Sequence, residues 1–226
     1  MAHNHVIFVA GGSGKRMGKE LPKQFIPVAD KPLLMWAIEA FEAYDPTLHK
    51  VVAVPYEHQG LWKDLCKQFN FQPAHDIATG GKTRFDTVKN ACRLIDDKGL
   101  TGVHDGVRPF PARDTISRAY TAADKYGAAI PFVKSIDSLR IIEHSHSKAI
   151  KRNQIIRVQT PQVFRSDLLK KAYQQPFQKE FTDDASVVEQ LGINIHLVQG
   201  NEENIKVTHK MDLRIAIMLA KYIHST

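Results

Sequence analysis

A stretch rich in glycine and basic residues follows the first apolar run of the chain and reads VAGGSGKRMGKELPKQF from position 9. Glycines let backbone N–H groups approach an anion closely, and three stand here: Gly11, Gly12 and Gly14. Three cationic side chains accompany them: Lys15, Arg16 and Lys23. This combination predicts a phosphate site, and so much charge suits a phosphate that becomes more negative during a reaction. The alternative is a flexible loop with solvated lysines.

Two widespread phosphate loops share part of this pattern, and the stretch departs from both. A Walker loop needs Ser or Thr after its Gly-Lys pair, whereas Arg16 follows Lys15, and no glycine stands at position 9. A dinucleotide fingerprint needs a third glycine where this chain has Met17. The stretch therefore matches neither motif, and it carries more cationic charge than a passively held cofactor needs.

A carboxylate and an arginine follow another apolar run, in the segment HDGVRP that starts at position 104. Asp105 is a candidate Mg²⁺ ligand, because carboxylates bind this ion and the ion bridges triphosphate oxygens. Arg108 is able to pair with a phosphate or with Asp105 itself. The alternative is a plain turn, since Asp-Gly and Arg-Pro are common in turns. A glycine pair, Gly80-Gly81, precedes a helical pattern that Thr83 or Gly81 is expected to cap.

The elements that must position these groups follow from the apolar patterning. Strands are expected at 6–10, 50–55, 101–104, 128–133 and 193–198, with a short one ending near position 80. Helices are expected from position 33 and over 60–69, 83–95, 114–126, 166–174 and 210–222. This alternation indicates an α/β fold with a mostly parallel, helix-covered sheet. Ligands then gather at the carboxyl ends of the strands, where the candidate groups lie.

A different pattern occupies residues 134–158, where polar and apolar residues alternate around the turn-prone segment EHSHSK. The pattern is too polar for a pair of core strands and too regular for disorder, so it predicts a β-arm that protrudes from the body. Such an arm often packs on a second copy, and we therefore expect a homodimer. No internal repeat or linker divides the chain, which favours one domain over 1–226 that carries this arm.

The composition is that of a globular protein. Among 226 residues, 43% are hydrophobic and 24% are charged, and the net charge is +7. This charge suggests an anionic partner, and its clustering beside glycine turns favours small phosphorylated ligands over nucleic acid. Two cysteines without metal-ligand spacing favour a reducing compartment, and no apolar run approaches the roughly 20 residues of a membrane span. We expect a cytoplasmic protein without a membrane or nucleic-acid partner.

Six short motifs, taken in order, resemble those of one enzyme family. They are AGGxGxRM with PKQF in the first loop, then GGxxR, HDxxRP, TPQ, TDxAS and NIKVT. Together they are similar to the 2-C-methyl-D-erythritol 4-phosphate cytidylyltransferases, nucleotidyltransferases of the non-mevalonate isoprenoid pathway. The resemblance covers almost the whole chain. It implies a three-layer Rossmann-like fold with a mostly parallel central sheet and a protruding β-arm.

The resemblance also implies a reaction and a set of site residues. The family transfers the cytidylyl group of CTP to methylerythritol phosphate by in-line attack on the α-phosphorus, with Mg²⁺, and releases pyrophosphate. Arg16 and Lys23 are implied to stabilise the transition state. The implied nucleotide contacts are Ala10, Gly11, Gly12, Gly14, Lys15, Gly81 and Thr87. The implied contacts to methylerythritol phosphate are Asp105, Arg108, Ser138, Lys206 and Arg152. Asp105 is also implied to lie near the metal, and Arg152 is implied to act from the neighbouring subunit.

Other readings of the same residues stay open. A ribitol 5-phosphate cytidylyltransferase shares the loop, DxxRP and TPQ; the segment RNQ and the hydroxyl of Ser138 favour methylerythritol phosphate. A basic polyanion-binding protein predicts strongly salt-dependent binding to any polyanion. An inactive regulator of the same fold has no support, because every inferred charged residue is present. For Lys206 and Arg152 the alternative is an ordinary solvent-exposed side chain without a ligand. Arg84 is expected to hold its loop in place. The sequence gives no role for Thr160, Gln162 and Asp183.

Overall fold

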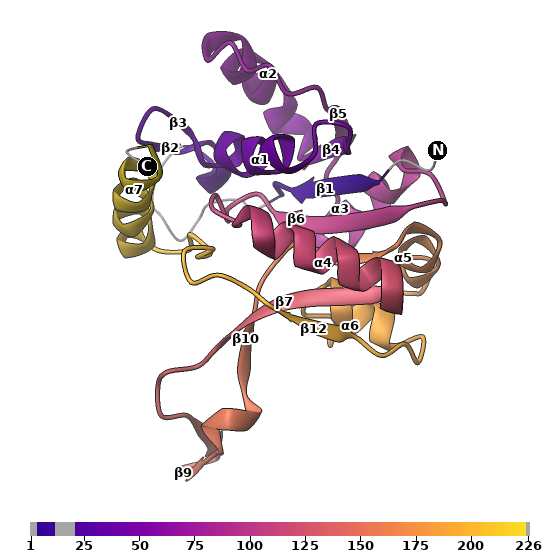
Figure 1. Ribbon diagram of the computed structural model, residues 1–226, viewed down its shortest axis with the longest axis vertical. Coiled ribbons are helices and arrows are strands. Elements are labelled where there is room, and N and C mark those ends of the chain that lie inside the picture. The colour runs from indigo at the N-terminus through magenta and orange to yellow at the C-terminus, as the bar shows by residue number, and fades with distance from the viewer. Residues whose placement is uncertain (1–3, 12–20, 225–226) are drawn as a thin grey trace.

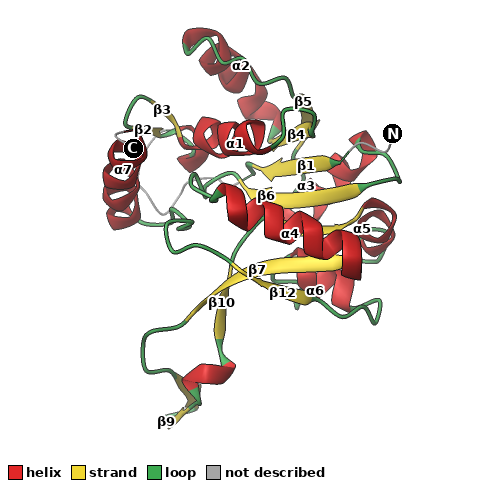
Figure 2. Ribbon diagram, viewed as in Figure 1, coloured by secondary structure: helices red, strands yellow, loops and turns green. Residues whose placement is uncertain are grey.

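The structure is a computed structural model that describes residues 4–11 and 21–224. Strands and helices alternate along most of the chain (Figures 1 and 2). The strands are β1 (His5–Val9), β2 (Pro27–Val28), β3 (Lys31–Pro32), β4 (His49–Val54), β5 (Asp76–Thr79), β6 (Leu100–Asp105), β7 (Ala128–Lys134), β8 (Arg140–Glu143), β9 (His146–Ala149), β10 (Ile156–Val158), β11 (Gln162–Arg165) and β12 (His196–Gln199). The α-helices are α1 (Leu33–Tyr44), α2 (Gln59–Gln68), α3 (Arg84–Ala91), α4 (Arg113–Tyr126), α5 (Ser166–Ala172), α6 (Asp184–Glu189) and α7 (Lys210–His224). Short 3₁₀ turns include η2 (Lys23–Phe25) and η5 (Arg152–Gln154).

The main sheet has the strand order β10-β7-β11-β6-β1-β4-β5, and β12 pairs with β7. Strand β1 runs parallel to β4 and β6, and the register places Val9 opposite both Ala53 and Asp105. Strand β11 is antiparallel to β6 and β7, and β10 is antiparallel to β7. The register therefore brings the loop after β1 and the end of β6 to one edge of the sheet.

Two apolar clusters cover the two faces of this sheet, because successive side chains of a strand point to opposite sides. Val6 and Phe8 of β1 face one cluster, which α1, α2 and α4 complete with residues such as Phe41, Trp62 and Ile116. Ile7 faces the other cluster, which α3, α5 and α6 complete with residues such as Phe85, Leu169 and Val188. The result is a three-layer α/β fold, as expected.

A third apolar cluster joins helix α7 to the β2–β3 ribbon and to the loop after β6. Ala216 and Ala220 of α7 pack with Trp36 and Phe110. Just before the helix, the Val207 amide donates to the carbonyl of Val107 at 2.9 Å. This bond lays the segment that carries Lys206 alongside the loop that follows Asp105.

The hairpin β8–β9 projects away from the sheet at the bottom of the view in Figure 1, which confirms the expected arm. Its two stems belong to the main sheet, since β7 runs into the arm and β10 runs out of it, with Lys134 opposite Ile156. The range 134–158 expected for the arm thus includes residues of two sheet strands at its ends.

Most expected elements appear within one to three residues of their predicted ends. The helix expected over 83–95 ends as an α-helix at Ala91 and continues as a 3₁₀ turn, Cys92–Leu94. Strands β10 and β11 were not predicted, and they add an antiparallel part to the sheet. Among residues 4–11 and 21–224, no helix is both long and apolar enough to cross a membrane.

Candidate functional site

A cavity of about 310 Å³ opens at the edge of the sheet where β1 and β6 end. It collects groups from five separate segments: the end of β1 with the loop after it, the turn η2, the start of α3, the end of β6 and the segment before α7. The predicted site residues that line it are Ala10, Gly11, Lys23, Gly81, Thr87, Asp105 and Lys206. Gly12, Gly14, Lys15 and Arg16 lie outside the described residues.

Glycine backbone and one threonine form the wall of the cavity that belongs to α3. The amide of Gly81 donates to Thr87 Oγ1 at 3.0 Å, and this hydroxyl donates to the Thr83 carbonyl at 2.9 Å. Thr83 caps α3 in a capping box with Asp86, which confirms one of the two expected caps. A Cβ at Gly81 would lie 2.2 Å from the Cβ of Asp86, so only glycine fits this turn.

The opposite wall is fixed by the residues around Lys23. The buried side chain of Gln24 donates to the carbonyl of Ala10 at 2.6 Å, and Phe25 stacks on Trp62 with ring centroids 5.9 Å apart. Lys23 is half-buried next to these anchored residues, and its Nζ donates to the carbonyl oxygen of Thr208 at 3.5 Å. The packing therefore holds the turn that brings Lys23 to the cavity.

Asp105 is the acidic side chain on the cavity wall. Its Oδ2 lies 2.7 Å from Lys206 Nζ, and its Oδ1 lies 3.3 Å from the Arg84 guanidinium. Burial alone raises the pKa of this carboxyl, but Arg84, Lys206 and Arg108 outweigh burial and hold the pKa well below its usual range. Asp105 is therefore ionised in the folded protein at any pH that an enzyme would normally meet.

A buried hydrogen-bond chain holds the backbone of Asp105. Its amide donates to Thr160 Oγ1 at 3.1 Å, and that hydroxyl lies 3.1 Å from Nδ1 of the fully buried His104. His104 Nε2 lies 2.9 Å from the carbonyl oxygen of Arg108, which only accepts, so Nε2 carries the hydrogen and Nδ1 accepts from Thr160. This chain gives Thr160 a structural explanation that its position in the sequence did not supply.

The same histidine predicts how the stability of the metal-free protein depends on pH. Burial lowers the pKa of His104 to about 4, whereas an unfolded chain binds this proton near pH 6.5. The contribution of neutral His104 is complete above pH 6.5 and is lost as the pH falls from 6.5 toward 4, by up to about 3 kcal/mol. Urea unfolding between pH 7.5 and pH 5 should show a steeper loss for the wild type than for His104→Gln. Equal slopes for the two proteins would contradict the assignment, and Asp105 does not interfere because it stays ionised over this range.

Three predicted substrate residues do not line the cavity. Arg108 donates to the carbonyl of Asn204 at 2.7 Å, and its Nε lies 3.8 Å from Asp105, so it ties two loops together. Ser138 and Arg152 lie exposed on the arm, where Arg152 donates to the carbonyl of Ile136 at 2.7 Å. Arg152 lines another cavity, of about 580 Å³, together with residues of the arm and its stems.

The remaining motif residues stabilise the face of the sheet behind the cavity. Gln162 accepts from the amide of Ala185 and donates to Asp183, each at 2.8 Å, and Asp183 caps α6. The sequence analysis missed Asp184, which is fully buried and accepts two hydrogen bonds from Arg84 at 2.8 and 2.7 Å. The available signal was the second acidic residue of TDDAS, because a carboxylate that begins a buried helix needs a cationic partner.

The cavity fits Mg²⁺ only as an ion that arrives with a phosphate ligand. No group of three or more His, Cys, Asp or Glu side chains in the described part of the chain is arranged to hold a metal. Asp105 is one carboxylate, and two cations already touch it. Mg²⁺ is commonly held in this way in proteins, by one or two carboxylates together with substrate phosphates and water.

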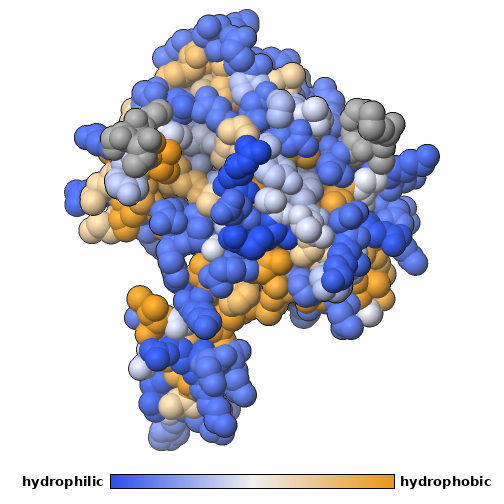
Figure 3. All heavy atoms as spheres, in the orientation of Figure 1, coloured by the Kyte–Doolittle hydropathy of each residue, from blue (hydrophilic) through white to orange (hydrophobic). Residues whose placement is uncertain are grey.

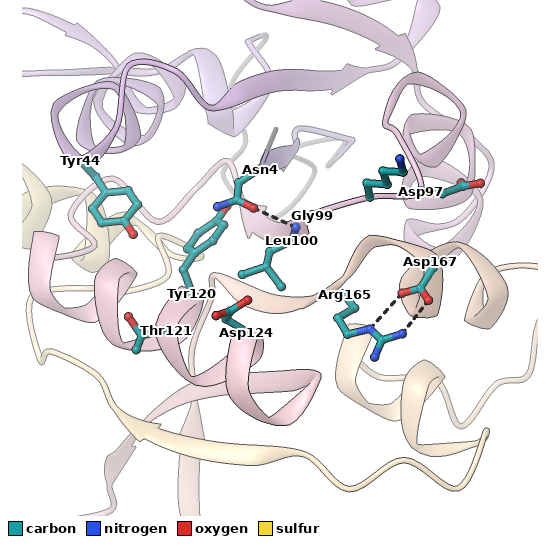
Figure 4. A pocket seen from close by; sticks show the side chains of 11 residues that line it. Asn4, Tyr44, Asp97, Gly99, Leu100, Tyr120, Thr121, Asp124, Arg165 and Asp167 are labelled. Atoms are coloured by element: carbon teal, nitrogen blue, oxygen red, sulfur yellow. Dashed lines mark hydrogen bonds and ion pairs between the residues drawn. The ribbon is translucent and has the colours of Figure 1, made fainter. Parts of the chain in front are cut away.

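A larger cavity, of about 760 Å³, opens at the other edge of the sheet, beside the starts of β1 and β6 (Figure 4). Asn4 closes one side by accepting from the amide of Leu100 at 3.0 Å, and Arg165 pairs with Asp167 at 2.8 Å. None of the predicted site residues that the structure describes lines this cavity. Size alone therefore does not identify the site, and the convergence of glycine backbone and charge favours the smaller cavity.

Comparisons with known proteins bear on the whole chain. The family model for 2-C-methyl-D-erythritol 4-phosphate cytidylyltransferase (IspD) matches residues 4–221. A protein of that name from Phocaeicola vulgatus is 51% identical over 217 residues, which cover 96% of this chain and 99% of that protein. Another, from Bacteroides thetaiotaomicron, is 50% identical over 214 residues, covering 95% and 98%. The crystal structure of the enzyme of that name from Thermus thermophilus matches with a TM-score of 0.78 at 29% identity, covering 98% of this chain and 100% of that one.

Proposed function

Because this chain belongs to the 2-C-methyl-D-erythritol 4-phosphate cytidylyltransferase family, it transfers the cytidylyl group of CTP to methylerythritol phosphate, and we propose that it does so by direct in-line displacement. A phosphate oxygen of methylerythritol phosphate forms a bond to the α-phosphorus of CTP. The bond that breaks joins this phosphorus to the oxygen that leaves with pyrophosphate, and CDP-methylerythritol is the second product. No covalent enzyme intermediate is needed, so the protein acts by positioning and by neutralising charge. The observation that supports this best is the convergence of Lys23, Lys206 and ionised Asp105 on one glycine-walled cavity.

We assign the nucleotide to the walls on either side of Thr87. Gly11 lies so close to this side chain that a Cβ there would sit 3.4 Å from Thr87 Oγ1, and Gly81 donates to the same oxygen. Ala10, Gly11 and Gly81 line this part of the cavity, and the two glycines leave it free of side chains, so we assign the base, ribose and phosphates to it. We propose that Gly12, Gly14 and Lys15, in the segment outside the described residues, complete the contacts to the triphosphate.

We propose that Lys23 and Arg16 stabilise the transition state. Negative charge builds on the bridging oxygen and on the departing pyrophosphate as the bond to the α-phosphorus breaks. Lys23 lines the cavity on a turn that the buried Gln24 anchors, which supports a role in which its ammonium group meets this charge with little reorganisation.

Mg²⁺, when bound, supplies further neutralisation of the triphosphate, and we propose Asp105 as the residue that would hold it. Asp105 is ionised and buried at the end of β6, and the chain from Thr160 to His104 fixes its backbone. We assign the same carboxylate a contact to the hydroxyls of methylerythritol phosphate, and we assign Lys206 a contact to phosphate.

We propose that the enzyme is a homodimer and that each arm completes the site of the other subunit. Apolar side chains gather on the arm in Figure 3, and its exposed apolar residues are Ile136, Ile141, Ile142 and Ile155. Within one chain, Arg152 lines a cavity that shares no residue with the nucleotide cavity. If Ser138 and Arg152 bind methylerythritol phosphate in the site of the second subunit, their distance from the nucleotide cavity of their own chain is explained. We propose that Arg108 holds the loop after β6 on the side that receives the partner's arm.

We further propose that residues 1–226 work as one cytidylyltransferase domain with its arm, in the cytoplasm and without a membrane or nucleic-acid partner. The free thiols of Cys66 and Cys92 suit a reducing compartment. The clustering of cations around a small cavity, in place of a long basic stripe, supports small phosphorylated ligands.

Pyrophosphate release tests the proposed substrate pair. The four ribonucleoside triphosphates should be assayed against methylerythritol phosphate and ribitol 5-phosphate, with Mg²⁺ present. We expect turnover with CTP and methylerythritol phosphate, and at least about a hundredfold lower kcat/KM for ribitol phosphate. The branched chain of methylerythritol and the linear chain of ribitol place their hydroxyls differently, so the wrong acceptor leaves polar groups of the site unpaired. A preference for ribitol phosphate would transfer the proposal to the alternative acceptor. No turnover with either acceptor, together with salt-sensitive binding to any polyanion, would favour the non-enzymatic reading.

A further inference from the structure

A buried carboxylate behind the cavity, Asp184, controls the arginine that touches Asp105. Asp184 is fully buried at the start of α6, and it accepts from both terminal nitrogens of Arg84 at 2.8 and 2.7 Å. Tyr173 of the segment after α5 donates its hydroxyl to the same carboxylate at 2.6 Å. Such a carboxylate is costly to bury unless it is paired and hydrogen-bonded, and these three bonds meet that requirement.

The geometry divides Arg84 unequally between two carboxylates. Toward Asp184 the guanidinium makes two short bonds, whereas toward Asp105 it makes a single contact at 3.3 Å. A paired, two-bond contact is the stronger arrangement, so Asp184 determines the orientation of the guanidinium. Oδ1 of Asp105 is consequently held loosely on that side, while Lys206 holds Oδ2 at 2.7 Å.

We propose that Asp184 is a positioning residue that acts through Arg84 to keep one oxygen of Asp105 available to the acceptor substrate. This inference rests on the proposed contact between Asp105 and the hydroxyls of methylerythritol phosphate. Without the negative charge of Asp184, Arg84 turns its two-bond face to Asp105 and occupies the oxygen that the substrate needs. The network reaches from α6 through α3 to the end of β6, and Asp184 lies 100 residues after Arg84 in the chain.

Calorimetric binding of the product tests this without turnover. CDP-methylerythritol carries the polyol and CMP lacks it, so the ratio of their affinities reports the polyol contact. We expect Asp184→Asn to weaken CDP-methylerythritol about tenfold and CMP less than about twofold. In a background of Asp105→Asn, the same substitution should weaken CDP-methylerythritol less than about twofold, because the residue through which it acts is already altered. Equal weakening of both ligands, or a full tenfold effect in that background, would overturn the proposal.

A matched control separates positioning from damage to α6. Asp183 caps this helix through Ser186 and accepts from Gln162, so Asp183→Ala disturbs the helix without removing an Arg84 partner. We expect Asp183→Ala to leave the affinity ratio unchanged even where it lowers Tm as much as Asp184→Asn does. A fall in the ratio that matches that of Asp184→Asn would overturn the proposal.

Tyr173→Phe is the variant to use if Asp184→Asn does not fold. It removes one bond to Asp184 and should lower the ratio two- to threefold, by about 0.5 kcal/mol. An unchanged ratio would overturn the proposal. Asp105→Asn alone tests the premise, since an unchanged ratio there defeats the proposed role of Asp105 itself.

Discussion

Replacing Lys23 by alanine should lower kcat on the order of a thousandfold, the largest effect expected of any described residue. In the proposed role, the ammonium group meets charge that appears only as pyrophosphate leaves, so its loss is felt mainly in the transition state. The Kd for CTP should rise by less than about tenfold, because the other proposed nucleotide contacts, Gly11, Gly81 and Thr87 among them, are unchanged. Rapid-quench measurement of a single turnover, together with calorimetric binding of CTP, separates the two quantities.

The control for Lys23 is another lysine in a similar local setting. Lys170 also donates to a backbone carbonyl, that of Ile95 at 3.1 Å, and pairs with Asp97, a residue of the cavity at the opposite edge of the sheet. Lys170→Ala should leave kcat within about twofold of the wild type, because most surface contacts contribute little. A wild-type kcat for Lys23→Ala, or an equal loss in kcat for the two variants, would refute the role assigned to Lys23.

The second large effect is expected at Arg152, on the arm. Arg152→Ala should raise the KM for methylerythritol phosphate by about tenfold to a hundredfold, since a hydrogen bond to a charged group contributes about 1.5–3 kcal/mol. The KM for CTP should change little, because Arg152 lies outside the nucleotide cavity. Arg140→Ala is the matched control, because that guanidinium bonds within the hairpin to Ser147 at 2.7 and 2.8 Å.

Mixed subunits show whether Arg152 acts on its own chain or on its neighbour. In a heterodimer of Lys23→Ala and Arg152→Ala chains, action across the interface leaves one site intact and places both defects in the other. Random reassociation of equal amounts should then recover about a quarter of wild-type activity in a two-fold symmetric dimer. Activity that stays at the level of the parent variants in verified heterodimers would place Arg152 and Lys23 in the same chain's site.

The sequence predicted the elements with strong periodic patterns and missed those whose pairing depends on distant residues. Strand β1 is a continuous apolar run, and helix α4 repeats its apolar face over several turns, so both were identified. Strands β10 and β11 have three and four residues, too few to establish a period of two, and β11 follows directly on a proline. Their place in the sheet is decided by β7 and β6: Ile156 of β10 pairs with Lys134, 22 residues earlier, and Gln162 of β11 pairs with Val103, 59 residues earlier.

Site residues could be predicted where neighbouring residues in the sequence already indicate the chemistry. They were missed where a residue acts by holding another residue that is distant in the sequence. Glycines and lysines beside a strand end indicate phosphate binding without knowledge of the fold. Three of the residues predicted in this way, Gly11, Gly81 and Lys23, line one cavity in the structure. Asp184 was missed because its partner, Arg84, lies 100 residues earlier: TDDAS indicates that a buried carboxylate needs a cation, but it does not identify which cation. Thr160 was noted without a role for the same reason, since its bonds to Asp105 and His104 depend on how β6 and the following loop pack.

Under the proposed role of Arg152 and Ser138, the arm carries a share of acceptor recognition that is structurally separate from the body. The hairpin leaves the body from β7 and returns through β10, and Lys134 and Ile156 face each other where it begins, so its two ends are held at a fixed separation. Under the proposed division of labour, a hairpin from a relative with a different polyol preference is transferable between these two residues without altering the loops that carry the nucleotide chemistry. In this proposal the arm is free to change its share of acceptor recognition while the nucleotide loops stay the same, and Asp105 and Lys206 remain the acceptor contacts that the body supplies.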